Sequence, residues 1–187
     1  MIIVKTPEQI KLMRIAGRIT GEALLLGGEM VKPGVSTKQI DDKIRHYIEK
    51  CGAKPSFLGY GGFPASACVS VNETVVHGIP DERTILKDGD IVTVDLCAYK
   101  NGYHGDACRT FCIGDVAPET RKLVKVTEEC FFKGVEGLRA GTPLYDIGYK
   151  VQRYAESFGY GVIRSYTGHG IGREMHEDPA VPNYGRL

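Results

Sequence analysis

Two aspartates eleven residues apart, Asp95 and Asp106, are the clearest candidates for chemistry in this sequence. Between them, Asn101-Gly102 separates two apolar runs, and this dipeptide is typical of a type I′ turn, which requires positive φ at both central residues. Counting outward from the turn makes the two aspartates diagonal neighbours on one face of a hairpin, about 5 to 8 Å apart. The spacing therefore predicts a divalent metal site or a general acid/base pair.

The two faces of the predicted hairpin differ in character. Alternate residues of the first strand form an apolar, core-facing set: Val92, Val94, Leu96 and Ala98. On the other face, like charges across strands repel unless something compensates them, and Asp is depleted inside strands. The alternative is that Asp95 and Asp106 are solvated residues on the open face of an antiparallel sheet, which is common. The hairpin by itself leaves both interpretations open.

Three of the five histidines lie in glycine-rich or turn-like segments: His77 in VVHGIP, His169 in TGHGIG and His176 in MHEDP. Glycines on both sides of His169 let the backbone approach other groups closely. Because an imidazole among oxygen ligands suits a divalent transition metal, His169 is the strongest ligand candidate. A hydrogen-bonded structural role is the alternative for a lone histidine. We interpret His46 and His104 as ordinary surface or edge residues.

Four helices and several strands must position these residues. The first two helices begin with capping boxes, at Thr6 and at Ser36. A third helix is expected over about 118–138, and Thr142-Pro143 is expected to begin a fourth. Between the second and third helices we expect strands, including one near 67–76 and the aspartate hairpin.

The second and fourth predicted helices contain a repeat at an offset of 107 residues. Identical residues recur in register: Gly34 with Gly141, Ile40 with Ile147, Lys43 with Lys150, Tyr47 with Tyr154, Glu49 with Glu156, and Gly52 with Gly159. Such self-similarity indicates one structural unit used twice, so we expect two related halves. The same offset carries the aspartate pair to positions 202 and 213, beyond Leu187. The second half is therefore expected to be incomplete.

Composition argues against several classes of protein. A net charge of +1 over 187 residues gives no electrostatic reason to expect nucleic acid as a partner. No apolar run approaches the roughly 20 residues of a membrane span, and the first residues lack the apolar stretch of a signal peptide. We expect one cytoplasmic, monomeric domain over 1–187, truncated at its C-terminus. The six cysteines include no Cys-x-x-Cys pair and are expected to be free thiols.

Three motifs occur in order along the chain: VSVNETVVHGIP, VDLCAYKNGYHGDACRTF and YTGHGIGREMHEDP. Together they closely resemble the bacterial type of methionine aminopeptidase, in the pita-bread metallopeptidase family. The resemblance implies a pseudo-twofold α/β fold whose central antiparallel sheet is flanked by helices. It also implies removal of the initiator methionine from nascent polypeptides, near the ribosome, by a hydroxide that bridges two divalent metal ions (Mn, Fe, Co or Zn).

The resemblance assigns roles to individual residues. Asp95 matches the family's terminal carboxylate ligand, Asp106 its bridging carboxylate and His169 its imidazole ligand. His77 and His176 match two catalytic histidines that contact the substrate and the transition state. The remaining substrate-binding candidates are the expected methionine pocket: Tyr60, Phe63, Cys68 and Met175. For each pocket residue, simple core packing is the alternative.

The chain departs from the family pattern in one respect. The family completes its site with two glutamates on strands after the Gly-His-Gly segment, beyond Leu187. We therefore expect two metal ions in the complete enzyme, and one or none in this chain, which offers three of five protein ligands. The alternative function is an inactive relative that binds peptide N-termini or a single metal without turnover. A proline-specific peptidase of the same fold is the enzymatic alternative, and its pocket residues should differ.

Overall fold

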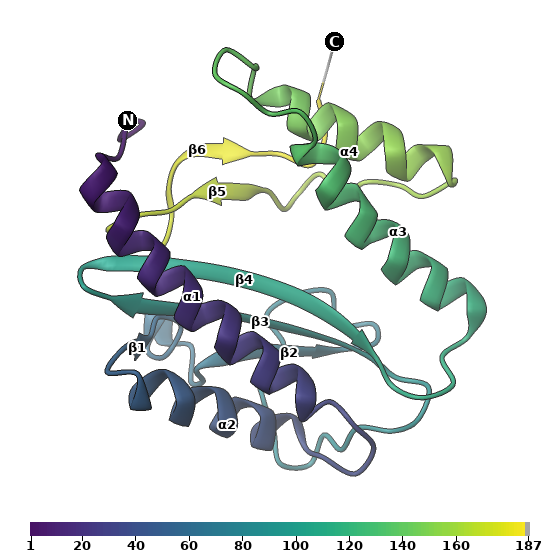
Figure 1. Cartoon of the computed structure of the whole chain (residues 1–187). Coiled ribbons are helices and arrows are strands. Elements are labelled where there is room, and N and C mark those ends of the chain that lie inside the picture. The colour runs from purple at the N-terminus through teal and green to yellow at the C-terminus, as the bar shows by residue number, and fades with distance from the viewer. Residues whose placement is uncertain (186–187) are drawn as a thin grey trace. The chain divides into compact units, whose positions relative to one another are not determined.

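The computed structural model of the chain describes residues 1–185 (Figure 1). They form two compact units, each described separately below. The first unit comprises residues 4–117 and 171–175, and the second comprises residues 1–3, 118–170 and those from 176 onward. The expected single domain over 1–187 stays a prediction, and its last two residues lie outside the described ones.

The first unit is an antiparallel sheet covered on one face by two helices. Its elements are α1 (Pro7–Glu29), α2 (Thr37–Lys50), β1 (Lys54–Pro55), a 3₁₀ turn (Tyr60–Gly62), β2 (Ala67–Val71), β3 (Ile91–Lys100) and β4 (Tyr103–Cys112). Strand β4 pairs with one edge of β3 along its whole length, while β1 and β2 pair with the other edge. Both predicted capping boxes are present, with the Thr6 and Ser36 hydroxyls accepting N–H bonds at the helix starts.

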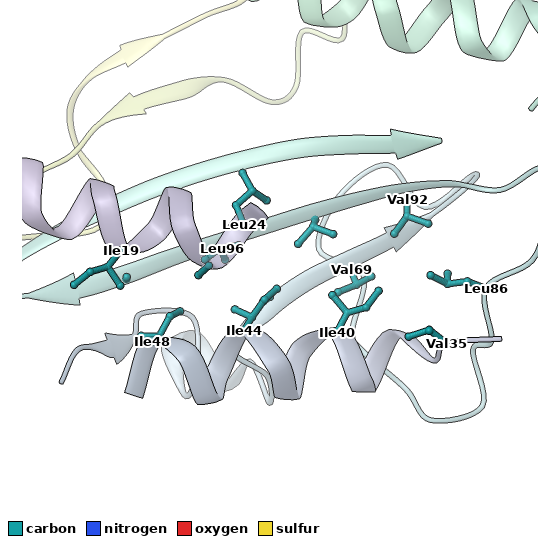
Figure 2. Close-up of a cluster of buried hydrophobic side chains, with 14 of the residues drawn as sticks. Ile19, Leu24, Val35, Ile40, Ile44, Ile48, Val69, Leu86, Val92 and Leu96 are labelled. Atoms are coloured by element: carbon teal, nitrogen blue, oxygen red, sulfur yellow. The ribbon is translucent and has the colours of Figure 1, made fainter. Parts of the chain in front are cut away.

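The core lies between the helices and the predicted apolar face of β3. Ile40, Ile44 and Ile48 of α2 are fully buried, as expected for residues one turn apart on an amphipathic helix. Figure 2 shows them directed toward the sheet residues Val92 and Leu96. All four predicted core residues of β3 have an exposed fraction of 0%, so this alternation is confirmed.

Strand β2 is shorter than predicted and is positioned by a buried carboxylate. It ends at Val71 because Asn72 has a φ of +50°, outside the range of an extended strand. At its start, Asp41 accepts hydrogen bonds from the backbone N–H groups of Ser66 (2.8 Å) and Ala67 (3.0 Å). The Asp41 side chain is only 2% exposed, so water cannot replace these bonds if the carboxylate is removed.

We expect Asp41→Ala to lower the free energy of unfolding of this chain by about 3 kcal/mol, because it leaves buried N–H donors without an acceptor. Urea denaturation followed by circular dichroism measures this loss. Asp42→Ala is the matched control, since Asp42 is 60% exposed and pairs with the same Lys38. The control should lose less than about 1 kcal/mol. Equal losses for the two variants would contradict the assigned role of Asp41.

The second unit contains a helix pair and a short two-stranded sheet. Its elements are α3 (Pro118–Val135), α4 (Tyr145–Ser157), β5 (Gly168–Gly170) and β6 (Glu177–Val181). Helix α3 ends before the predicted residue 138. Helix α4 begins at Tyr145, later than predicted, because the Thr142 hydroxyl accepts from the Arg139 N–H and closes the preceding turn instead of capping the helix.

The contacts inside each unit reproduce the predicted repeat. The Tyr47 hydroxyl donates to Glu22 (2.6 Å), and the Tyr154 hydroxyl donates to Glu129 (2.8 Å), each partner being displaced by the same 107 residues. With the same offset, every residue of α2 except the first, Thr37, has its counterpart within α4. One helix-pair unit is therefore used twice in this chain.

The helix crossings repeat as well. A Cβ added at Gly27 would lie 2.8 Å from the Ile44 side chain, and one added at Gly134 would lie 2.8 Å from the Val151 side chain. Both glycines allow a close approach of their helix to its partner. Because Gly134 and Val151 are the repeat counterparts of Gly27 and Ile44, the two helix pairs pack through equivalent positions.

Candidate metal and substrate site

The aspartate hairpin has the predicted geometry. Asn101 and Gly102 have φ values of +54° and +84°, as a type I′ turn requires. In the resulting register Asp95 lies opposite Cys108, and Asp106 lies opposite Cys97. Both carboxylates therefore belong to the face of the hairpin that does not form the core, and they are diagonal neighbours there.

The electrostatics of this face suit a cation. Burial, together with the negative charge of Asp106, raises the pKa of Asp95 to about 7. The two carboxylates therefore disfavour each other's charge in the absence of a counterion. A divalent cation with a preference for hard oxygen ligands would relieve that repulsion, so the pair fits the metal that the sequence implies.

Three thiols lie on the strands of this part of the sheet, Cys68 in β2, Cys97 in β3 and Cys108 in β4. Burial raises the pKa of Cys68, Cys97 and Cys108 to about 12, with Asp95 and Asp106 adding to the shift. These thiols are therefore protonated at neutral pH and behave as small apolar groups. All six cysteines of the chain lie within the described residues and are free, as predicted.

His104, interpreted above as an ordinary edge residue, is a well-positioned member of the same face. Its Nδ1 lies 2.8 Å from the Ser56 hydroxyl, and its ring centroid lies 4.7 Å from that of Tyr99. Its backbone N–H donates to the Gly172 carbonyl (2.9 Å). Counting by twos from the turn already places His104 beside Asp106, but its partners are distant in sequence, so only the structure identifies them.

The four predicted pocket residues all lie in the first unit. Cys68 is 4% exposed and pairs in register with Asp95 from the β2 side. Phe63 packs edge-on against Phe57, with ring centroids 6.4 Å apart. Met175 is 4% exposed, whereas Tyr60 is 56% exposed in the 3₁₀ turn. Among the four pocket candidates, Cys68 is thus the one that the pairing of β2 with β3 places next to a predicted metal ligand, Asp95.

His77 occupies an unusual backbone position in the loop after β2. Its φ of +58° is uncommon for a residue other than glycine, and such outliers concentrate at functional sites. The next residue, Gly78, is held against β2, since its N–H donates to the Ser70 hydroxyl (3.0 Å) and its carbonyl accepts from the Val69 N–H (2.9 Å). These bonds hold the backbone next to His77 in place, while the His77 side chain is exposed.

His169 and His176 lie together in the second unit. His169 is in β5, paired with Ala180 of β6, and its ring centroid lies 4.2 Å from that of His176. The His169 Nδ1 lies 2.9 Å from the Gly170 carbonyl oxygen, which can only accept, so Nδ1 carries the proton. In the neutral ring Nε2 then has the lone pair, which is the state that a metal ligand needs.

The predicted ligand set is divided between the units, with Asp95 and Asp106 in the first and His169 in the second. Within residues 1–185, no three His, Cys, Asp or Glu side chains are grouped closely enough to hold a metal ion. The assignment of these three residues as ligands therefore stays a prediction. Among the same residues, none of the helices combines the length and apolar character that crossing a membrane requires.

Comparisons with known proteins agree with the motif resemblance. The profile of metallopeptidase family M24 matches residues 11–187. A methionine aminopeptidase from Clostridium acetobutylicum is 56% identical over 186 residues, covering 100% of this chain and 74% of the relative. Crystal structures of methionine aminopeptidases from Rickettsia prowazekii (TM-score 0.96, 44% identity) and Thermotoga maritima (0.97, 41%) each cover 100% of this chain and 75% of theirs. The predicted pita-bread α/β class is confirmed.

Proposed function

This chain belongs to metallopeptidase family M24, and on that premise we propose that it is a metal-dependent aminopeptidase that removes N-terminal methionine. The observation that carries the proposal is the register of the β3–β4 hairpin, which places Asp95 and Asp106 on one face. Relatives that match the chain over its whole length include methionine aminopeptidases.

We assign Asp95, Asp106 and His169 as the ligands that this chain contributes to two divalent metal ions, of Mn, Fe, Co or Zn. When bound, such ions supply a nucleophile at neutral pH and polarise the scissile carbonyl. The raised pKa of Asp95 and the Nδ1-protonated state of His169 support the assignment. Metal binding should lower the pKa of Asp95, because the cation favours the charged carboxylate.

We assign His77 and His176 as hydrogen-bond donors to the peptide backbone of the substrate. His176 donates a hydrogen bond to the oxyanion that forms when the carbonyl is attacked. His77 donates to the peptide beyond the scissile bond. Cys68, Phe63, Tyr60 and Met175 contact the methionine side chain, for which a protonated thiol and aromatic rings are suitable apolar neighbours.

The proposed partner is the N-terminus of a nascent polypeptide that begins with Met. We place this reaction in the cytoplasm, near the ribosome, and we propose that the enzyme acts as a monomer. A small net charge of +1 is in keeping with a peptide substrate and gives no electrostatic reason for binding nucleic acid.

The test uses two proteins: the 187-residue chain, and an extended chain in which it is followed by the segment of the Clostridium acetobutylicum relative that comes after the matched region. Each is assayed for release of methionine from a Met-Ala-Ser peptide with Mn²⁺ or Co²⁺, and for metal stoichiometry by calorimetry. Release of methionine by the extended chain, with two ions bound, is expected. A folded extended chain that binds one ion or a peptide without turnover would support the alternative of an inactive binding relative.

Asp95 makes the stability of the metal-free chain depend on pH. Its pKa in the folded state, about 7, lies above the ordinary value of 3.8, so the folded state is stabilised by protonation and loses that stability as pH rises through 7. We expect Asp95→Asn to raise the free energy of unfolding in the presence of a chelator, by about 1 to 2 kcal/mol more at pH 8 than at pH 5. Urea denaturation at the two pH values measures the difference.

The exposed Asp42→Asn is the control for this experiment, and its effect should change by less than about 0.5 kcal/mol between the two pH values. If Asp95→Asn has the same effect at pH 5 and pH 8, the carboxylate is not perturbed by burial and by Asp106 as described.

A further inference from the structure

Alternate residues of β2 share a face with the proposed metal ligand Asp95. Val69 is directed into the core (Figure 2), so its neighbours Cys68 and Ser70 face the other side of the sheet. Cys68 pairs in register with Asp95, which also faces away from the core. Ser70 is 4% exposed and follows Cys68 by two residues. It therefore lies on the same face, one step along the strand from the proposed metal site.

The loop that follows β2 returns to the same strand at Gly78. The Gly78 carbonyl accepts from the Val69 N–H (2.9 Å), and the Gly78 N–H donates to the Ser70 hydroxyl (3.0 Å). A Cβ added at Gly78 would overlap the Val69 carbonyl oxygen, so only glycine can approach the strand this closely. One of the two polar groups of Gly78 is thus bound by the main chain of β2, and the other by a side chain.

The bond to the Ser70 hydroxyl acts directly on the backbone of His77. The N–H that it accepts from belongs to the planar peptide group that joins His77 to Gly78. The orientation of this group fixes ψ of His77, whose φ of +58° lies in the left-handed region that favours glycine. A residue with a side chain keeps such a conformation only where its surroundings impose it. Ser70 supplies part of that constraint.

We propose that Ser70 is a positioning residue for His77 in the aminopeptidase reaction. Its hydroxyl holds the peptide group after His77, and this sets the direction in which the His77 imidazole leaves the backbone. Because Cys68 and Ser70 belong to one strand, β2 ties the position of His77 to that of Asp95. The inference rests on the proposed function of His77 as a donor to the substrate.

Other bonds hold the two ends of this loop. At its start, the Asn72 side chain accepts from the first N–H of β3 (3.0 Å). At its end, the Thr37 hydroxyl donates to the Asp81 carbonyl (3.0 Å) and accepts from the Asp81 N–H (2.9 Å). Neither anchor acts on the N–H that Ser70 binds. Removing the Ser70 hydroxyl should therefore release one peptide group while the rest of the loop stays in place.

The chain offers a matched control in Ser66, the residue directly before β2. Ser66 is 0% exposed, and its buried hydroxyl has no hydrogen-bond partner among residues 1–185. Ser66→Ala thus makes the same chemical change as Ser70→Ala in a similarly buried place, but without loss of a bond. Ser70→Thr and Ser70→Val form a second matched pair, since both side chains suit a strand and have nearly the same shape, and only Thr keeps the acceptor.

The first measurement requires no turnover. The chain has five histidines, so ¹³C-labelled histidine gives few NMR signals, and His77→Ala identifies that of His77. The ¹³Cα shift reports the backbone dihedral angles of the residue. In the 187-residue chain and in the extended chain, we expect this shift to change in Ser70→Ala and in Ser70→Val. It should stay the same in Ser70→Thr and in Ser66→Ala.

The second measurement is a double-mutant cycle in the extended chain. Ser70→Ala should lower kcat/KM for the Met-Ala-Ser peptide about tenfold, because a misdirected imidazole contacts the substrate poorly. In a His77→Ala background the same change should cost less than about twofold, since Ser70 then has no imidazole to position. Ser70→Thr should recover most of the activity, and Ser66→Ala should stay within about twofold of the unsubstituted enzyme.

A purely structural role for Ser70 predicts a different result. Its loss would then multiply with that of His77→Ala, and a full tenfold effect in the His77→Ala background would overturn the proposal. An unchanged His77 signal in Ser70→Ala would overturn it as well. If the unsubstituted extended chain releases no methionine, the proposed function fails instead, and the NMR signals still decide whether Ser70 fixes the backbone of His77.

Discussion

In the extended chain, Asp106→Ala is expected to reduce kcat/KM for the Met-Ala-Ser peptide by on the order of 10³-fold and to remove at least one bound divalent ion. Asp106 is the carboxylate that the family resemblance assigns as the bridging ligand, so its loss affects both proposed ions. The variant should still fold, because Asp106 is exposed on the face of the hairpin opposite the core. Peptide hydrolysis and isothermal titration with Mn²⁺ measure the two effects.

Two further variants make this result specific. Asp106→Asn keeps the size of the side chain and removes its charge, so it should lose nearly as much activity as Asp106→Ala. Asp42→Ala, which removes an exposed carboxylate of α2, should retain full activity and full metal content. If Asp106→Ala keeps two ions and more than a tenth of the activity, the aspartate face is not the metal site.

His176→Ala is expected to lower kcat in the extended chain by about 10²- to 10³-fold, with a change in KM below about threefold. The oxyanion that His176 is proposed to stabilise exists only in the transition state, so removing its donor affects kcat more than substrate binding. The metal stoichiometry should be unchanged, which distinguishes His176 from the proposed ligand His169, although the two rings lie side by side.

His46→Ala serves as the control for this variant, since His46 is exposed on α2 and should be dispensable. A His176→Ala variant with a much higher KM and an unchanged kcat would contradict the proposed role. That result would place His176 in ground-state binding of the peptide. Loss of a metal ion in the same variant would instead make His176 a ligand and require a new assignment of His169.

Features governed by neighbours in the sequence could be predicted from the sequence. The Asn101-Gly102 turn set the register of β3 and β4, and that register alone placed Asp95 and Asp106 on one face. Capping boxes fixed the starts of α1 and α2, and alternation identified the core face of β3. These are short-range effects, since a turn type or a cap depends on dihedral angles and side chains only a few residues apart. The three motifs likewise sufficed to indicate the family.

Features that depend on contacts between distant segments were decided only by the tertiary structure. Burial in the folded chain is the main cause of the raised pKa of Asp95, and His104 acquires Ser56 as a partner across 48 residues. The start of α4 and the end of β2 differed from the predictions for a local reason instead, because turn geometry at Thr142 and at Asn72 competed with the helix and strand patterns. The exposure of Leu123 and Phe131 on α3 could not be predicted from the sequence. These two residues are eight positions apart, a spacing that on an amphipathic helix is equally typical of buried residues. Whether an apolar side chain is covered depends on which other element lies against it, and that is a property of the folded chain.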